Sequence, residues 1–134
     1  MTIKGSCFCG EVNYQIDGKL RDARSCHCSM CRKAFGAQAS AFAFVKPEEF
    51  SWASGEELLT GYESKKGPGL KFCSKCGSTL VGTYKGEIMG VTLGCVNGNP
   101  GIELGMHIFV GSKASWETIP AGVPQYEEWP PKND

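Results

Sequence analysis

Seven of the eight cysteines in this chain fall into three short clusters, and only Cys95 stands alone. The clusters read Cys7-Phe8-Cys9, Cys26-His27-Cys28-Ser29-Met30-Cys31 and Cys73-Ser74-Lys75-Cys76. Zinc takes four ligands in a tetrahedron, with sulfur at about 2.3 Å, so two closely spaced cysteines deliver two ligands from one pass of the chain. The spacing therefore predicts metal sites built from thiolates.

The first and third clusters are each followed by a glycine, Gly10 and Gly77. Glycine adopts a positive φ without a Cβ clash, and the backbone amide beside it can point at a thiolate. The shared feature favours pairing these two clusters into one closed structural site, whose metal would contribute to the free energy of folding. The predicted ligands of this site are Cys7, Cys9, Cys73 and Cys76.

The middle cluster supplies three thiolates without a fourth cysteine nearby. Three protein ligands and one open position are typical of a catalytic zinc. Three thiolates give the site a net negative charge, which suits exchange of a soft sulfur ligand, so a substrate thiolate is the expected fourth ligand. The flanking Arg24, Arg32 and Lys33 would offset that charge and attract an anionic substrate. The predicted ligands of this open site are Cys26, Cys28 and Cys31.

An alternative is that a protein side chain completes the second site, which would make both sites structural. His27 is a poor candidate because a residue between two ligands on an extended segment faces away from them. His107 lies in an apolar run, where a histidine is typically a hydrogen-bonded core residue. Cys95 follows Leu93-Gly94 and is interpreted as a small buried hydrophobe.

The chain has 134 residues, 18 glycines and 7 prolines, which predicts one mainly β domain over residues 1–134 with little helix. Period-two alternation and turn residues predict strands over 11–16, 40–45, 58–63, 70–72, 78–84, 88–93, 105–110 and 116–119. Lys85-Gly86 is the expected hairpin turn, and a turn of helix is expected after Ser29. Residues 120–134 are expected to form a tail wrapped over the domain, with fraying past Tyr126 as the alternative.

Charge and hydropathy narrow the class of partner and compartment. Lys plus Arg equals Asp plus Glu at 14 each, so no overall field favours nucleic acid or an anionic membrane. No stretch approaches the ~20 apolar residues of a membrane span. We expect a cytoplasmic protein without a nucleic-acid or membrane partner, and a reducing compartment argues against disulfides. The sequence does not predict an oligomeric state.

Four motifs together resemble the glutathione-dependent formaldehyde-activating enzyme (GFA) family, which also includes carbon–sulfur lyase-like zinc proteins. They are Gly5-Ser6-Cys7-Phe8-Cys9-Gly10, Cys26-His27-Cys28-Ser29-Met30-Cys31-Arg32-Lys33, Phe72-Cys73-Ser74-Lys75-Cys76-Gly77-Ser78 and His107-Ile108-Phe109. The resemblance implies a zinc-bound β-tent fold of several short antiparallel sheets and two zinc ions per chain. The ligands it implies agree with the grouping above: a structural zinc on Cys7, Cys9, Cys73 and Cys76 and a catalytic zinc on Cys26, Cys28 and Cys31.

The activity implied by this resemblance is zinc-dependent carbon–sulfur lyase or synthase chemistry on a thiol adduct. Glutathione would capture formaldehyde to give S-hydroxymethylglutathione, or the same bond would be cleaved. The carboxylates of a glutathione substrate need cations, and the candidates are Arg32, Lys33, Lys66 and Lys71, with Lys65 nearby. The proton donor is left open between water, His27 and His107.

The sequence departs from the family pattern at two places, and both departures are expected to affect substrate recognition more than the fold. Leu93-Gly94-Cys95-Val96-Asn97 stands where family members often have Gly-Thr-Leu-Asp, and Lys71 stands where arginine is common. Two other functions are therefore kept as alternatives. One is a non-catalytic zinc-binding interaction module, and the other is a thiol-based redox protein that uses Cys95.

Overall fold

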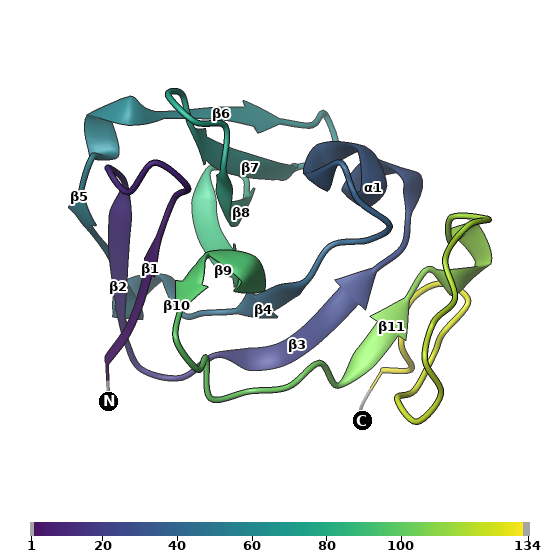
Figure 1. The fold of residues 1–134 in the computed structure, drawn as a ribbon. Coiled ribbons are helices and arrows are strands. Elements are labelled where there is room, and N and C mark those ends of the chain that lie inside the picture. The colour runs from purple at the N-terminus through teal and green to yellow at the C-terminus, as the bar shows by residue number, and fades with distance from the viewer. Residues whose placement is uncertain (1, 133–134) are drawn as a thin grey trace. The chain divides into compact units, whose positions relative to one another are not determined.

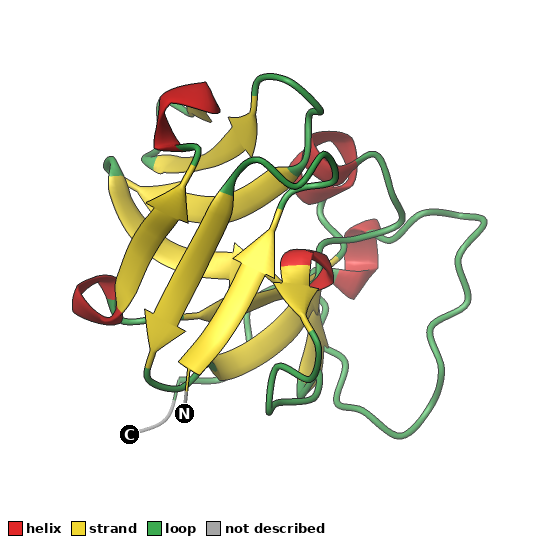
Figure 2. Ribbon diagram, turned by 60° about the vertical axis from the view of Figure 1, so that its left-hand side comes forward, coloured by secondary structure: helices red, strands yellow, loops and turns green. Residues whose placement is uncertain are grey.

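The computed structural model describes residues 2–132 and is mainly β with a single α-helix in that range, as predicted (Figures 1 and 2). Contacts divide the chain into two compact units. The first unit comprises residues 2–21 and 43–102, and the second comprises residues 22–42 and 103–132. The prediction of one domain over 1–134 stays a prediction, and each unit is described by itself.

An antiparallel sheet in the first unit has the strand order β10-β1-β2-β5 (Figure 1). Its strands are β1 (Thr2–Ser6), β2 (Asn13–Asp17), β5 (Phe50–Ser54) and β10 (Val96–Asn97). The predicted alternation is confirmed, because Val12, Tyr14 and Ile16 are almost fully buried. The Tyr14 ring packs against Phe50, with the ring centroids 5.1 Å apart. This apolar face holds the β1–β2 loop, which carries the first cysteine pair.

A second set of strands in the first unit forms an antiparallel meander in the order β9-β8-β7-β6. These are β6 (Leu59–Glu63), β7 (Pro68–Cys73), β8 (Thr79–Tyr84) and β9 (Glu87–Thr92). In the sequence, the division between the units falls after the first residue of β4 (Phe42–Phe44). Lys85 and Gly86 have φ values of 51° and 83°, so the predicted hairpin turn between β8 and β9 is confirmed. The connection from β7 to β8 carries the third cysteine cluster. Short 3₁₀ turns at Pro47–Glu49, Glu56–Leu58 and Leu93–Cys95 link other strands.

The second unit contains β3 (Arg21–Cys26) from Asp22 onward, helix α1 (Ser29–Phe35), β11 (Met106–Ile108) and a 3₁₀ turn at Val110–Ser112. Strands β3 and β11 pair in parallel, with Ser25 opposite His107, and lie side by side in Figure 1. The expected helical turn after Ser29 is confirmed. The helix ends at Gly36, which adopts the left-handed conformation common at helix C-termini.

The C-terminal segment lies along β11 in the second unit. The His107 amide donates to Pro124 O at 2.8 Å, and the Tyr126 amide donates to His107 O at 2.9 Å. Beyond Tyr126, the ring of Trp129 contacts that of Phe109 edge-on. These contacts tie the described part of the tail to β11. Residues 133 and 134 of the predicted tail lie outside the described residues.

One predicted strand, 116–119, is wrong. Trp116 is exposed, so apolar burial does not favour an extended conformation there. A local turn forms instead: the Glu117 amide donates to Ala114 O, and Lys113 Nζ donates to Glu117 O at 2.7 Å. Strands β1, β3, β5 and β10 were not foreseen: β1, β3 and β10 are short or largely polar, whereas the apolar residues of β5, Phe50 and Trp52, were a period-two signal that was missed. Within residues 2–132, no helix is long and apolar enough to cross a membrane.

Candidate metal centres

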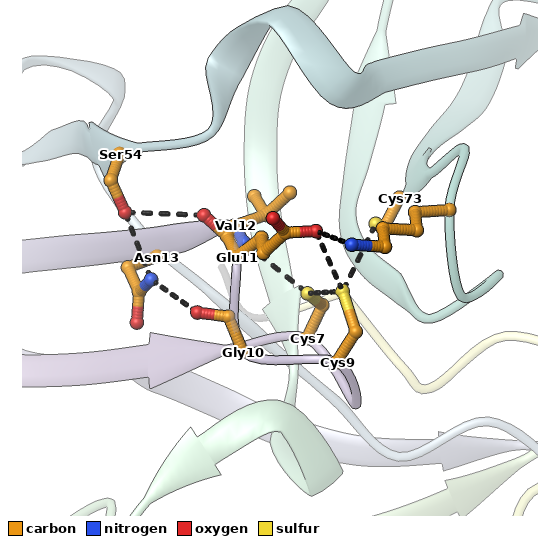
Figure 3. A network of polar contacts seen from close by, with 9 residues as sticks. Cys7, Cys9, Gly10, Glu11, Val12, Asn13, Ser54 and Cys73 are labelled. Carbon is orange, nitrogen blue, oxygen red and sulfur yellow. Dashed lines mark hydrogen bonds and ion pairs between the residues drawn. The ribbon is translucent and has the colours of Figure 1, made fainter.

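The sulfur atoms of Cys7, Cys9, Cys73 and Cys76 all lie within 4.8 Å of one another in the first unit. The Cys7 and Cys9 sulfurs are 3.5 Å apart, and those of Cys9 and Cys73 are 3.9 Å apart (Figure 3). A tetrahedron of sulfurs at about 2.3 Å from zinc has edges of about 3.8 Å. All four cysteines are free thiols rather than cystines. The donor set and its spacing therefore fit a four-thiolate metal site.

Two similar turns present these four cysteines. Gly10 and Gly77 have φ values of 83° and 82°, which confirms the positive φ predicted for both. The Gly10 amide donates to Cys7 O at 3.1 Å, and the Gly77 amide donates to Cys73 O at 2.8 Å. Because the same turn recurs on two separate segments, each contributes a cysteine pair to the same small volume.

Hydrogen-bond donors stabilise the thiolate form of two members of this group, Cys7 and Cys76. Burial raises the pKa of Cys7, but hydrogen bonds from the Val12 amide, the Cys9 thiol and the Gly10 amide together lower it below its usual value. The Val12 amide lies 3.3 Å from the Cys7 sulfur. The Ser78 hydroxyl and amide lower the pKa of Cys76 to about 5. These contacts favour the ligand form that a metal requires.

An ion pair that the sequence analysis missed lies beside the same group. Lys75 Nζ is 2.6 Å from Glu11 Oε2, and that oxygen is 3.9 Å from the Cys9 sulfur. The Glu11 carboxylate raises the pKa of Lys75, so the ammonium stays charged next to the thiols. Figure 3 shows the Glu11 side chain beside Cys9. Lys75 lies between two cysteines in sequence, which is the signal that could have identified it as a charge-compensating residue.

A hydrogen-bond network also anchors the turn at Gly10 (Figure 3). The Asn13 side-chain amide donates to Gly10 O and to Ser54 Oγ, both at 2.9 Å. The Ser54 hydroxyl donates to Glu11 O at 3.2 Å. The turn that carries Cys9 is thus fixed by side chains of β2 and β5 as well as by its own backbone.

Removing the Ser78 hydroxyl is expected to weaken metal binding at the four-cysteine group. Its oxygen accepts the Phe8 amide at 2.8 Å and lies 3.4 Å from the Cys76 sulfur, so one side chain joins the two turns. Ser78→Ala should reduce affinity roughly 10–100-fold, as loss of an outer-shell partner typically does. Chelator competition measures the change, and Ser115→Ala on the exposed surface is the control. Equal affinity for both variants would contradict the prediction.

The sulfur atoms of Cys26, Cys28 and Cys31 form a second group in the second unit, again all within 4.8 Å of one another. Cys26 ends β3, Cys28 is the N-cap of α1, and Cys31 lies in the first turn of that helix. The Cys28 sulfur accepts the Cys31 amide at 3.3 Å, as an N-cap side chain does. Within this unit the group has three members, so the donors fit a metal site with one position left for another ligand.

Ser40 supports the three-cysteine group and was also missed from the sequence. Its hydroxyl accepts the Cys26 amide at 3.1 Å, and its own amide donates to Cys26 O at 3.0 Å. Hydrogen bonds from Cys26 first, and also from Cys28 and Ser40, lower the pKa of Cys31 to about 6. The Cys31 thiolate and burial raise the pKa of Cys26, because one proton is shared between the two sulfurs. Ser40 is nine residues after Cys31, so spacing alone gave no signal for it.

The two histidines pair with each other instead of joining the three sulfurs. His27 is almost fully buried, and its Nε2 lies 3.0 Å from Nδ1 of the half-buried His107. Burial and the neighbouring His107 lower the pKa of His27. This agrees with the expectation that His27 faces away from the metal and that His107 is hydrogen-bonded.

The predicted substrate-binding cations are divided between the two units. Arg32 and Lys33 lie on α1 next to Cys31, and Arg32 Nε donates to His27 O at 3.4 Å. Lys66 is exposed in the β6–β7 connection of the first unit, and Lys71 lies within β7. The assignment of these four residues to substrate binding stays a prediction.

Cys95 belongs to neither sulfur group. It ends the 3₁₀ turn at Leu93–Cys95, is half-buried, and donates from its sulfur to Thr79 O at 3.4 Å. Burial raises the pKa of the Cys95 thiol, so its protonated form is favoured. This environment is that of a packed thiol, in line with the sequence interpretation.

The fold and the two sulfur groups define a mainly β protein with two candidate thiolate metal centres. The family model for glutathione-dependent formaldehyde-activating enzymes matches residues 2–112, and the chain belongs to that family. A protein of Halomonas elongata, provisionally named a glutathione-dependent formaldehyde-activating enzyme, is 30% identical over 86 residues. The match covers 60% of this chain and 55% of that protein, so the chain spans about half of its relative's length.

A solved structure also resembles this chain. The crystal structure of a Rhodobacter sphaeroides protein superposes with a TM-score of 0.55 and 32% sequence identity. The alignment covers 72% of this chain and 91% of that protein. The fold is therefore shared with an experimentally determined protein.

Proposed function

We propose that this chain is a zinc-dependent carbon–sulfur lyase or synthase that interconverts glutathione plus formaldehyde with S-hydroxymethylglutathione. The observation that carries this proposal is the contrast between the two sulfur groups: four thiols converge in one, whereas three converge in the other. Family membership supplies the class of substrate, glutathione and formaldehyde. In this proposal Cys7, Cys9, Cys73 and Cys76 hold a structural zinc, and Cys26, Cys28 and Cys31 hold a catalytic one.

Zinc bound to the three-cysteine group would supply the positive charge that keeps an incoming substrate thiol in its thiolate form. The chain's own residues orient and support that site. The Ser40 hydroxyl accepts the Cys26 amide, and the Cys31 amide in the first turn of α1 donates to the Cys28 sulfur. Arg32 and Lys33, one and two residues beyond Cys31, add positive charge that attracts the carboxylates of glutathione.

The proposed reaction balances without an oxidant or a reductant. The substrate sulfur forms a bond to the carbonyl carbon of formaldehyde while the C=O π bond opens, and the proton lost by the thiol ends on that oxygen. The reverse direction breaks the carbon–sulfur bond and returns the proton to sulfur. Holding both reactants at one site replaces an encounter in solution by an oriented approach, which is the main acceleration expected.

The buried pair of histidines narrows the choice of proton donor. The Nε2 atom of His27 is engaged by His107, and the ring is almost fully buried, so His27 is not available to a substrate. His107 is half-buried. We therefore assign the proton transfer to water, with His107 as the histidine that remains to be tested.

The test follows the exchange between ¹³C-formaldehyde and its glutathione adduct by NMR. Zinc-loaded protein should accelerate the exchange above the uncatalysed rate, chelated protein should not, and reloading should restore it. Zinc-edge absorption should show the average number of sulfurs per zinc rising from about 3.5 to about 4 when glutathione is added. An unchanged sulfur count together with an exchange rate equal to the uncatalysed one would favour the non-catalytic zinc module.

A further inference from the structure

His27 lies directly between two of the three clustered cysteines, and its ring is the most buried part of that segment. His27 is 2% exposed, whereas Cys26 and Cys28 are each only half-buried. On an extended segment alternate side chains point in opposite directions. The burial of the histidine ring therefore determines the direction in which both neighbouring sulfurs point.

The ring of His27 is held by one specific hydrogen bond. Its Nε2 is 3.0 Å from His107 Nδ1, the ring centroids are 5.2 Å apart, and the ring planes are inclined at 44°. Within residues 2–132, no hydrogen-bond partner reaches the buried Nδ1 of His27. A buried N–H without an acceptor is costly, so the favoured tautomer leaves Nδ1 unprotonated. In this tautomer Nε2–H of His27 donates to Nδ1 of His107.

His107 is itself fixed from several sides. Its amide donates to Pro124 O at 2.8 Å, and its carbonyl accepts the Tyr126 amide at 2.9 Å. Its strand, β11, pairs in parallel with β3, placing His107 opposite Ser25. The next residue, Ile108, accepts the His27 amide at 2.9 Å. The imidazole of His107 is thus a firmly placed partner for the ring between the two cysteines.

We infer that His27 and His107 form a positioning pair, and that the Nε2–Nδ1 hydrogen bond between them sets the metal affinity of the Cys26, Cys28 and Cys31 group. Neither ring is a ligand in this arrangement. The inference rests on the proposed function only in treating these three cysteines as a metal site. It makes the tertiary contact between β11 and the ligand segment a determinant of that site.

The test exploits the fact that the hydrogen bond uses a different nitrogen of each ring. Glutamine places an amide nitrogen near the position of a histidine Nε2, and asparagine places an amide oxygen near that of Nδ1. His27→Gln and His107→Asn should therefore keep the bond, whereas His27→Asn and His107→Gln should lose it. His27→Phe fills the buried volume but cannot form the bond.

Metal affinity is measured by competition between a chromophoric chelator and protein loaded with two zinc ions. The three disrupting variants should bind zinc at the three-cysteine group roughly 10–100-fold more weakly than the original chain. The two conservative variants should keep an affinity close to that of the original chain. Cobalt substitution provides a second readout, because its visible absorption bands report the ligand geometry. The zinc at the four-cysteine group and the circular dichroism spectrum serve as internal references for folding.

Several results would overturn the inference. One is that His27→Phe keeps the original affinity, which would reduce the ring to a space-filling role. Another is that the glutamine and asparagine variants have the same zinc affinity at each of the two histidine positions. If the His27 variants fail to fold, the comparison of His107→Asn with His107→Gln decides whether the inference holds, because His107 is only half-buried and its variants are expected to fold. These experiments measure metal affinity and not turnover. The affinity pattern can therefore hold even if the formaldehyde chemistry is absent, and the chemistry can be present even if the affinity pattern fails.

Discussion

Replacing Cys73 with serine is expected to remove most of the free energy of folding. The side chain of Cys73 is fully buried at the end of β7, and its sulfur lies 3.9 Å from that of Cys9 on the β1–β2 loop. Structural zinc sites in small peptides contribute about 10–16 kcal/mol at neutral pH. A typical domain has a net stability of only about 5–15 kcal/mol. A serine hydroxyl is a poor substitute for a thiolate ligand, so the first unit should unfold or become marginal.

Zinc content and urea unfolding followed by circular dichroism measure this effect. Cys95→Ser is the matched control, because its hydroxyl can keep the hydrogen bond to Thr79 O and its sulfur belongs to neither group. The control should retain two zinc ions, and its free energy of unfolding should fall by about 1 kcal/mol at most. If Cys73→Ser kept two ions and the original unfolding midpoint, the four cysteines would not form a structural metal site.

Replacing Cys28 with serine is expected to abolish turnover while leaving the fold intact. Cys28 is the N-cap of α1, and serine is among the most favourable N-cap residues, so the hydrogen bond from the Cys31 amide can persist. The metal site would lose one of its three thiolates. Loss of outer-shell partners alone costs 10–100-fold at many metal sites, so removing a direct ligand should lower the exchange rate at least about 100-fold.

This second prediction is checked by formaldehyde exchange together with zinc content. Cys28→Ser should bind about one zinc per chain rather than two and should show the original circular dichroism spectrum. Ser29→Ala is its matched control, since Ser29 is the exposed neighbour of Cys28 in the first position of α1. Exchange at the original rate from a Cys28→Ser protein with one zinc would remove the three-cysteine group from the mechanism.

Much of the fold could be predicted because its signals are local. The alternation of Val12, Tyr14 and Ile16 and the hairpin turn at Lys85-Gly86 depend on side chains and backbone angles within a few residues. Strands such as β3 and β10 gave no such signal. Their sequences are short or polar, and partners distant in sequence, such as β11 for β3 and β1 for β10, determine that they are extended. The error at 116–119 has a different origin, since a local contact from the Lys113 ammonium to Glu117 O closes a turn there.

The sequence by itself determined which cysteines gather into the two candidate metal centres of this protein. Cysteine spacing and the glycines after two of the pairs are covalent features, and they were sufficient to separate a group of four from a group of three. Only the tertiary structure decided what surrounds those sulfurs: Glu11 with Lys75, Ser78, Ser40, and the pair formed by His27 and His107. Hydrogen bonds and ion pairs depend on ångström-scale distances between segments up to 80 residues apart, and no local pattern encodes those distances.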